Sequence, residues 1–347
     1  MSTPKIYFGA GLFSKDQGYN FAEDIKPWLD ALSENKDVIS GLDSAVAYQE
    51  CEEWLGQLQA GPQYGFTIDT KVTGGLHPVL AATKENVIAQ AKESLTKVGV
   101  NQASPSWIEM FRYVFTFGIL FLHAPDARVP VEETLSGFDV LYKEGIFKQF
   151  GLADHSAEQV EQVVKICKEK GFVLPSAFQG SYNPIARLAE DDLLPVLRKH
   201  GISFVAYSPM AGGFLAKTSS QFHQPGSLHG RWDRTGFFGK VSHYLYNKPV
   251  ALRALDKWHE IAKAEGISGA EMAYRWVAFN SALTKDDGLV VGATTVEQWR
   301  SNLAGIQKGP LSPETAAKID ALWTPELKAD STRNNFDAIK AVMASAT

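Results

Sequence analysis

Short apolar segments alternate with longer amphipathic segments along most of the chain. The apolar segments predict eight buried strands, at 5–10, 38–45, 65–71, 119–124, 147–153, 176–182, 202–209 and 288–293. The amphipathic segments, in which apolar residues recur every three or four positions, predict helices at 21–35, 84–98, 131–145, 157–171, 191–201, 269–280 and 296–305. This alternation is typical of a parallel sheet covered by helices.

A parallel sheet of this kind either closes into a barrel or stays open and doubly wound. An open nucleotide-binding sheet needs a glycine-rich turn after an early strand, and the only candidate, FGAGLF at 8–13, lacks the G-x-G-x-x-G spacing. We therefore predict an α/β fold, a (β/α)8 TIM barrel with long loops at its C-terminal face, such as 214–247. No linker is evident, so residues 1–347 are predicted to form a single domain.

Four side chains with suitable chemistry fall at the C-terminal ends of neighbouring predicted strands, where barrels carry their active sites. Asp43 and Tyr48 follow the second strand, Lys71 the third and His123 the fourth. Hydride addition to a carbonyl makes an alkoxide that needs a proton, and Tyr48 could supply it. Lys71 is expected to lower the pKa of that phenol, Asp43 to hold Lys71 charged, and His123 to orient the carbonyl oxygen.

Each of these residues also has a purely structural interpretation. Asp43 could cap a helix, Tyr48 could belong to the core, Lys71 could be a solvated charge, and His123 could be a hydrogen-bonded barrel histidine. We favour catalysis because all four fall at the mouths of adjacent units.

Several motifs resemble, in order, those of the aldo-keto reductase superfamily. They include LDSAVAYQECEEWLG at 42–56, LFLHAPD at 120–126, AYSPMAGGFLAK at 206–217 and VVGATTVEQWRSNLAG at 290–305. The resemblance covers roughly residues 5–336 and is nearest to the fungal aflatoxin-aldehyde-reductase-like branch. It implies NADPH as cofactor, with NADH as the alternative, and an aldehyde or ketone as the small-molecule partner. Secondary-metabolite aldehydes are the substrates that this branch suggests.

The resemblance also assigns roles to residues along the cofactor. Gln179 and Asp154 would meet the nicotinamide carboxamide, and Tyr207 would stack on its ring. The residues around the pyrophosphate would be Ser208, Pro209, Met210, Ala211, Gly212, Gly213 and Lys217. Arg231 would be a further cofactor-binding residue, from the long loop. Those at the adenosine end would be Gly292, Thr294, Gln298 and Asn302.

The chain departs from the superfamily pattern after the fifth predicted strand. Ala153 and Asp154 stand where the superfamily has Ser-Asn, and an ionised aspartate donates no hydrogen bond. His155 is expected to neutralise part of that charge. Gly292 and Gln298 are neutral where a basic residue often meets the 2′-phosphate of NADPH, which leaves Arg300, Arg231 and Lys240 as candidates.

A second departure is an aromatic-rich insertion at 101–117, between the third helix and the fourth strand. One hypothesis is an added loop or partner-binding patch at the N-terminal face of the barrel. The other is an artefact of gene prediction, such as a retained intron.

Composition narrows the function classes. A formal net charge of −5 argues against a nucleic-acid partner. Only two cysteines occur, without a metal-binding spacing, which favours a reducing, cytoplasmic location and no metal site. The longest apolar run, 113–124, is too short to span a membrane. A homodimer is left open.

These observations predict an NADPH-dependent oxidoreductase that reduces aldehydes or ketones. The alternative is a cofactor-binding regulatory barrel with little or no turnover. A barrel hydrolase or isomerase would need paired carboxylates or metal-ligating histidines at the strand mouths, and neither pattern is present.

Overall fold

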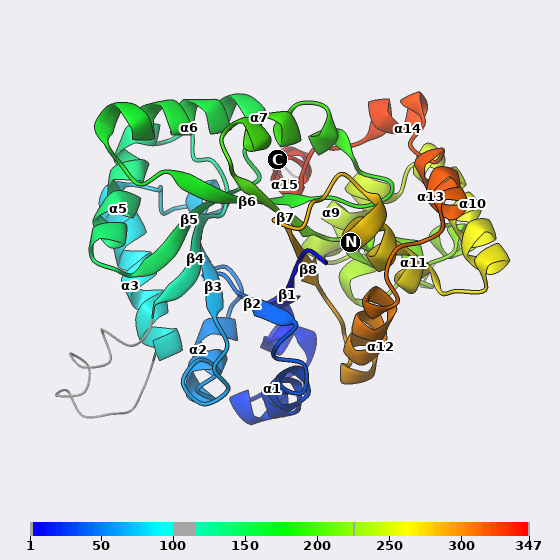
Figure 1. Ribbon diagram of the computed structural model, residues 1–347, viewed down its shortest axis with the longest axis horizontal. Helices are drawn as coiled ribbons and strands as arrows, with labels where there is room; N and C mark the ends of the chain where they lie inside the picture. The colour runs from blue at the N-terminus through cyan, green and yellow to red at the C-terminus, as the bar shows by residue number, and fades with distance from the viewer. Residues whose placement is uncertain (1–2, 100–115, 225, 346–347) are drawn as a thin grey trace.

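The computed structural model describes residues 3–99, 116–224 and 226–345. Within them, eight parallel strands close into a barrel in sequence order, with β8 pairing back onto β1 (Figure 1). The strands are β1 (Lys5–Gly9), β2 (Ile39–Asp43), β3 (Ile68–Val72), β4 (Phe117–Leu122), β5 (Phe147–Ala153), β6 (Pro175–Ser181), β7 (Ser203–Tyr207) and β8 (Gly288–Val291). The predicted (β/α)8 barrel is confirmed, and each strand lies at its predicted place.

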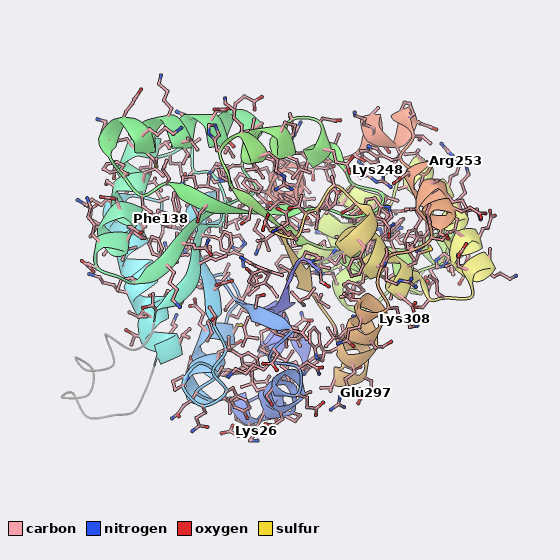
Figure 2. All side chains as sticks on the ribbon, viewed as in Figure 1. Lys26, Phe138, Lys248, Arg253, Glu297 and Lys308 are labelled. Carbon is pink, nitrogen blue, oxygen red and sulfur yellow. The ribbon has the colours of Figure 1, made fainter. Side chains whose placement is uncertain are left out.

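The helices lie around the outside of this barrel (Figure 1). They are α1 (Lys26–Ser33), α2 (Cys51–Gln57), α3 (Lys84–Gly99), α5 (Val131–Lys143), α6 (Ala157–Lys170), α7 (Leu193–Lys199), α8 (Ser219–His223), α9 (Phe237–Tyr246), α10 (Pro249–Glu265), α11 (Gly269–Arg275), α12 (Val296–Gln307), α13 (Pro313–Asp320), α14 (Pro325–Asp330) and α15 (Asn335–Ala344). Side chains, among them Phe138 of α5, fill the layer between helices and sheet (Figure 2). The Phe138 ring is tilted against that of Phe150 of β5, with centroids 4.4 Å apart.

Two predicted helices are shorter than expected. The segment 21–35 begins with a 3-10 turn over Ala22–Ile25, and α1 starts only at Lys26, with Pro27 in its first turn. The segment 269–280 is α-helical to Arg275 and continues as a π-turn over Trp276–Asn280. Proline explains the first boundary because it lacks the N–H that a helix interior requires.

In the barrel interior, aromatic side chains pack directly against glycines of the neighbouring strands. A Cβ on Gly151 would lie 2.2 Å from the Phe121 ring, and one on Gly288 would lie 2.7 Å from the Tyr7 ring. Two polar side chains of β3, Asp69 and Lys71, are also fully or almost fully buried. The lower interior is thus filled with side chains, which leaves the C-terminal mouth for chemistry.

The segment 214–247 folds into short helices around an aromatic cluster. Trp232 and Tyr246 are buried against Phe214, with ring centroids 5.9 and 5.5 Å away. The indole of Trp232 donates a 2.9 Å hydrogen bond to the Gly212 carbonyl. Helix α9 of this segment packs on α15 through Val241, Ala338 and Val342.

Most of the predicted insertion, 101–115, lies outside the described residues, and its last residue, Phe117, is the first of β4. The single domain over 1–347 stays a prediction. Among the described helices, none combines the length and apolar character needed to cross a membrane.

Candidate active site

A buried ion pair forms the centre of the strand mouths. Lys71 Nζ donates to Asp43 Oδ1 at 2.8 Å and to the Ser44 carbonyl at 2.8 Å, with no side-chain exposure at Lys71. The same ammonium lies 5.0 Å from the centroid of the Tyr48 ring. The four residues that sequence reasoning selected at adjacent mouths are therefore brought together, because the Tyr48 ring also meets the His123 ring edge-on at 5.9 Å.

Local backbone hydrogen bonds set this arrangement. A turn closed by Tyr48 N to the Ala45 carbonyl carries Tyr48 back over β2, directly before α2. The His123 amide donates to the Val72 carbonyl at 2.9 Å, which places the imidazole one residue beyond β4. Gly11, which sequence reasoning did not select, has no Cβ that would crowd the Tyr48 ring, since a Cβ there would lie 3.2 Å from it.

Burial and Lys71 act on the pKa of Tyr48 in opposite directions. Burial raises the pKa of Tyr48, and the nearby Lys71 offsets only part of that rise. Lys71 lowers the pKa of Tyr48, as expected, but desolvation of the phenolate outweighs this neighbouring charge, so the pKa stays above its usual value. Burial alone would lower the pKa of Lys71, but Asp43 and Tyr48 hold it above its usual value. At neutral pH the site therefore holds a protonated phenol beside an ammonium.

His123 is neutral in this setting. Burial, followed by the charge of Lys71, holds the pKa of His123 well below its usual value. Its Nδ1 is buried and has no hydrogen-bond partner among the described residues. A buried polar atom without a partner is uncommon and points to a ligand or water at this mouth.

The residues expected at the nicotinamide lie on the next strands. Gln179 of β6 donates from Nε2 to Asp43 Oδ1 at 2.7 Å, so it is tied to the ion pair. Asp154 follows β5 with a left-handed φ of 55°, and its Oδ1 accepts from the Tyr207 hydroxyl at 2.8 Å. Burial raises the pKa of Asp154 to about 7.

His155 does not neutralise Asp154. Its Nδ1 lies 2.7 Å from the Ala153 carbonyl, and burial lowers the pKa of His155 to about 4. The expected charge compensation was therefore wrong, because a buried imidazole bound to a carbonyl stays neutral at pH 7.

The loop after β7 has an unusual backbone. Ser208 has a φ of 55°, and three successive residues, Ala211, Gly212 and Gly213, have φ values of 52°, 64° and 89°. Only glycine adopts this region freely, and such conformations concentrate at functional sites. The amides of Ala211 and Gly213 donate to the carbonyls of Ser208 and Met210.

Arg231 lies over this same loop. A Cβ on Gly212 would lie 3.9 Å from Arg231 Cδ, and the guanidinium acts on the pKa of Tyr48. Pro209 and Lys217 bound the loop, and burial lowers the pKa of Lys217. The cation of Arg231 is therefore close enough to Tyr48 to act on its pKa.

The residues expected at the adenosine end form one cluster at the start of α12. Gln298 Oε1 accepts from the amide and hydroxyl of Thr294 at 3.0 and 2.8 Å. Asn302 donates from Nδ2 to the Gly292 carbonyl at 3.2 Å. Arg300 of α12 is held by Glu34, with its shortest contact at 2.8 Å. No atom would lie within 4 Å of a Cβ on Gly292, so this surface is open.

The comparisons with known proteins agree with this geometry. A sequence model described as the aldo/keto reductase family matches residues 5–324. The chain belongs to this family, and it is an oxidoreductase that acts on aldehydes or ketones.

Named relatives come from fungi and mammals. The chain is 34% identical over 332 residues to oxidoreductase sirO of Leptosphaeria maculans, covering 92% of this chain and 94% of that protein. It is 33% identical over 218 residues to aflatoxin B1 aldehyde reductase member 2 of Mus musculus, covering 59% and 58%. It is 30% identical over 209 residues to aldo-keto reductase pigE of Monascus ruber, covering 58% and 60%. The resemblance stated from the motifs is confirmed.

Proposed function

We propose that this chain reduces aldehydes or ketones with NADPH and that Tyr48 is the general acid. The observation that carries the proposal is the buried Asp43–Lys71 pair at 2.8 Å, with the ammonium 5.0 Å from the Tyr48 ring centroid. Taking a lysine wholly out of water is costly unless it is paired, so a site that keeps one beside a phenol suits proton transfer.

The chain's own residues fit a dinucleotide along the mouth. The left-handed loop at 211–213 would follow its pyrophosphate, and the open surface at Gly292, with Thr294, Gln298 and Asn302, would hold its adenosine. Tyr207, Gln179 and Asp154 would meet the nicotinamide at the other end, where Gln179 contacts Asp43 and Tyr207 contacts Asp154. When bound, NADPH supplies the hydride.

The protein residues handle the proton. Tyr48 holds its proton on Oη until the substrate oxygen becomes basic, and Lys71 stabilises the phenolate that remains. Asp43 keeps Lys71 charged and in place. A neutral His123 can donate one hydrogen bond to the carbonyl oxygen, which favours the charge that develops there.

For the substrate we propose secondary-metabolite aldehydes, by analogy with the aflatoxin B1 aldehyde reductase relatives. Of the aromatic residues in 214–247, Trp232 and Tyr246 are packed inside the segment, whereas Phe237, Phe238 and Tyr244 are exposed. The exposed rings are the ones free to contact an apolar substrate. Two buried free cysteines suit the reducing cytoplasm that we propose as the location.

The test follows NADPH absorbance with a panel of small aldehydes, comparing wild type with Tyr48→Phe. We expect turnover to fall by about 10²- to 10⁴-fold in the variant, because the ring stays and only the proton donor is lost. Tyr7→Phe is the matched control, a second buried tyrosine inside the barrel, and should retain wild-type turnover. Equal rates in Tyr48→Phe would remove Tyr48 from this role. NADPH binding without turnover in the wild type would favour the regulatory barrel.

A further inference from the structure

The start of α15 contacts the nicotinamide end of the candidate site. Three successive residues take part: Asn334 Nδ2 donates to the Asp154 carbonyl at 3.2 Å, the Asn335 amide to the Tyr207 hydroxyl at 3.3 Å, and the Phe336 amide to Asp154 Oδ2 at 3.3 Å. All three lie beyond residue 324, where the match to the family model ends. This contact is therefore not part of what the family match describes.

These contacts provide hydrogen-bond acceptors for the first backbone amides of α15. The first amides of an α-helix have no partner inside the helix. In α15 the amides of Asn335 and Phe336 are taken by Tyr207 and Asp154, and that of Asp337 by the Asn334 side chain at 2.8 Å. The coenzyme-site residues thus cap α15.

Asp154 divides its two carboxylate oxygens between the site and the helix. Oδ1 accepts from the Tyr207 hydroxyl and Oδ2 from the Phe336 amide. The Tyr207 hydroxyl both donates to Asp154 and accepts from Asn335, which fixes it from two directions. The other charged groups that act on the Asp154 carboxyl are Asp337 and Lys71.

Residues 331–345, here called the C-terminal arm, are also fastened elsewhere. The Phe336 ring lies against Gly75 of the loop after β3, since a Cβ there would be 3.2 Å from Cζ. Arg333 pairs with Asp192 at 2.7 Å on the outer side. Helix α15 packs on α9, as Figure 1 shows, and α9 belongs to the segment whose Trp232 holds the Gly212 carbonyl.

We propose that Asp154 is a positioning residue that joins Tyr207 to the C-terminal arm, so that the hold on the nicotinamide depends on the arm. The proposal rests on the proposed function, because it takes Tyr207 as the residue that stacks on the nicotinamide. Asp154 acts through Tyr207 and α15 and need not touch the coenzyme. The Tyr207 hydroxyl and the Phe336 amide both donate to the Asp154 side chain, which explains why a carboxylate with two acceptor oxygens suits this position.

The first test measures the NADPH dissociation constant of two Asp154 variants by fluorescence titration. Asp154→Ala removes both contacts and should weaken binding by about tenfold. Asp154→Asn should stay within about threefold of wild type, because its Oδ1 can accept from Phe336 while its Nδ2 donates to the Tyr207 oxygen. With saturating NADPH, kcat should change less than the coenzyme affinity. An alanine variant with a lower Tm but wild-type affinity overturns the proposal.

The second test separates positioning from a direct contact between Asp154 and the coenzyme. Asn334→Ala, which removes the arm's hold on the Asp154 carbonyl, should also weaken NADPH binding. Its effect should not add fully to that of Asp154→Ala in the double variant. Met343→Ala, at an exposed position of α15, is the control and should keep wild-type affinity. Wild-type affinity in Asn334→Ala, or full additivity, overturns the proposal.

The third measurement needs no coenzyme. Amide hydrogen exchange at Asn335 and Phe336 should be faster in Asp154→Ala than in wild type and unchanged in Asp154→Asn. Unchanged exchange in Asp154→Ala overturns the proposed link to the arm. If the wild type failed to bind NADPH, the proposed function would fail, and this exchange comparison would still report on the link.

Discussion

The two ends of the barrel each contain a buried aspartate, and the two are used differently. Asp287, just before β8 at the N-terminal end, accepts from both Arg198 nitrogens at 2.7 and 2.6 Å, from the Phe204 amide at 2.7 Å, and from the amide and hydroxyl of Thr284 at 2.7 and 2.9 Å. Asp43, at the C-terminal end of β2, accepts from Lys71 and Gln179 on the same oxygen.

This difference suggests that Asp287 contributes to stability, whereas Asp43 belongs to the candidate active site. At Asp287 every donor belongs to the scaffold, and the group ties α7, β7 and the loop before β8 together. Asp43 is paired with Lys71, whose ammonium lies 5.0 Å from the Tyr48 ring centroid. The Tyr48 ring in turn meets that of His123, whose Nδ1 has no partner among the described residues. Saturated polar networks make a structure rigid, whereas an incomplete one leaves groups for a ligand.

The most damaging change is expected at the C-terminal end, with Lys71→Met. It removes the cation that stabilises the Tyr48 phenolate, so kcat/KM should fall by about 10²- to 10⁴-fold. It also leaves Asp43 buried with Gln179 as its remaining donor, so the free energy of unfolding should fall by about 3–5 kcal/mol. Steady-state kinetics and chemical denaturation measure both. Lys97→Met, at an ion pair with Glu93 on the surface of α3, is the control and should change neither.

At the other end, Asp287→Ala should affect stability without affecting chemistry. Breaking this buried pair should lower the free energy of unfolding by about 3–5 kcal/mol, because Arg198 and two amides lose their acceptor. Turnover per folded molecule should stay at the wild-type value. A large loss of kcat at a temperature where the variant is folded would contradict the division between the two ends. Glu326→Ala, at an exposed ion pair with Arg253, should change stability by less than about 1 kcal/mol.

Between the two ends, Asp69→Asn should stabilise the protein in a pH-dependent way. Burial raises the pKa of Asp69 from 3.8 to about 7, so its ionised form is disfavoured in the folded state. The penalty is complete above pH 7 and disappears as the pH falls towards 4. Asparagine can still accept from the Ile119 amide and does not ionise. Denaturation should show a gain of about 1–3 kcal/mol at pH 8 that shrinks towards pH 4. A gain that is the same at every pH would refute this explanation.

The smallest effect is expected from Arg300→Ala, outside both ends. Its ion pair with Glu34 is half exposed, so stability should change by less than about 1 kcal/mol. If Arg300 turns towards the 2′-phosphate, NADPH should bind about three- to tenfold more weakly while NADH binding is unchanged. Equal weakening for both coenzymes would remove Arg300 from phosphate recognition.

The residues at the C-terminal ends of the strands could be predicted because the barrel fold itself determines where they lie. Eight alternating strand–helix units imply a parallel barrel. In such a barrel the residues that follow the strands all lie at the same end. Asp43, Tyr48, Lys71 and His123 follow from that rule, since strand order and sequence order coincide. The periodic patterns of 84–98 and 157–171 likewise depend on neighbours along the chain, and both helices formed there.

Contacts between distant segments could not be predicted in this way. The pKa of Tyr48 depends on how deeply surrounding segments bury it, and this burial outweighs the lowering by Lys71 that the sequence predicted. His155 is neutral for the same reason. The contacts of Asp154 with Phe336 join residues 182 apart in sequence, and no local pattern near either one signals the other.

Local pattern was thus sufficient to predict the barrel and the rim that carries the candidate residues, because periodic burial and strand direction are properties of short segments. The electrostatic states of the rim and the docking of α15 onto Asp154 and Tyr207 were set by packing across the molecule. Desolvation and hydrogen-bond partners depend on every group that surrounds an atom, and those groups come together only when the chain folds.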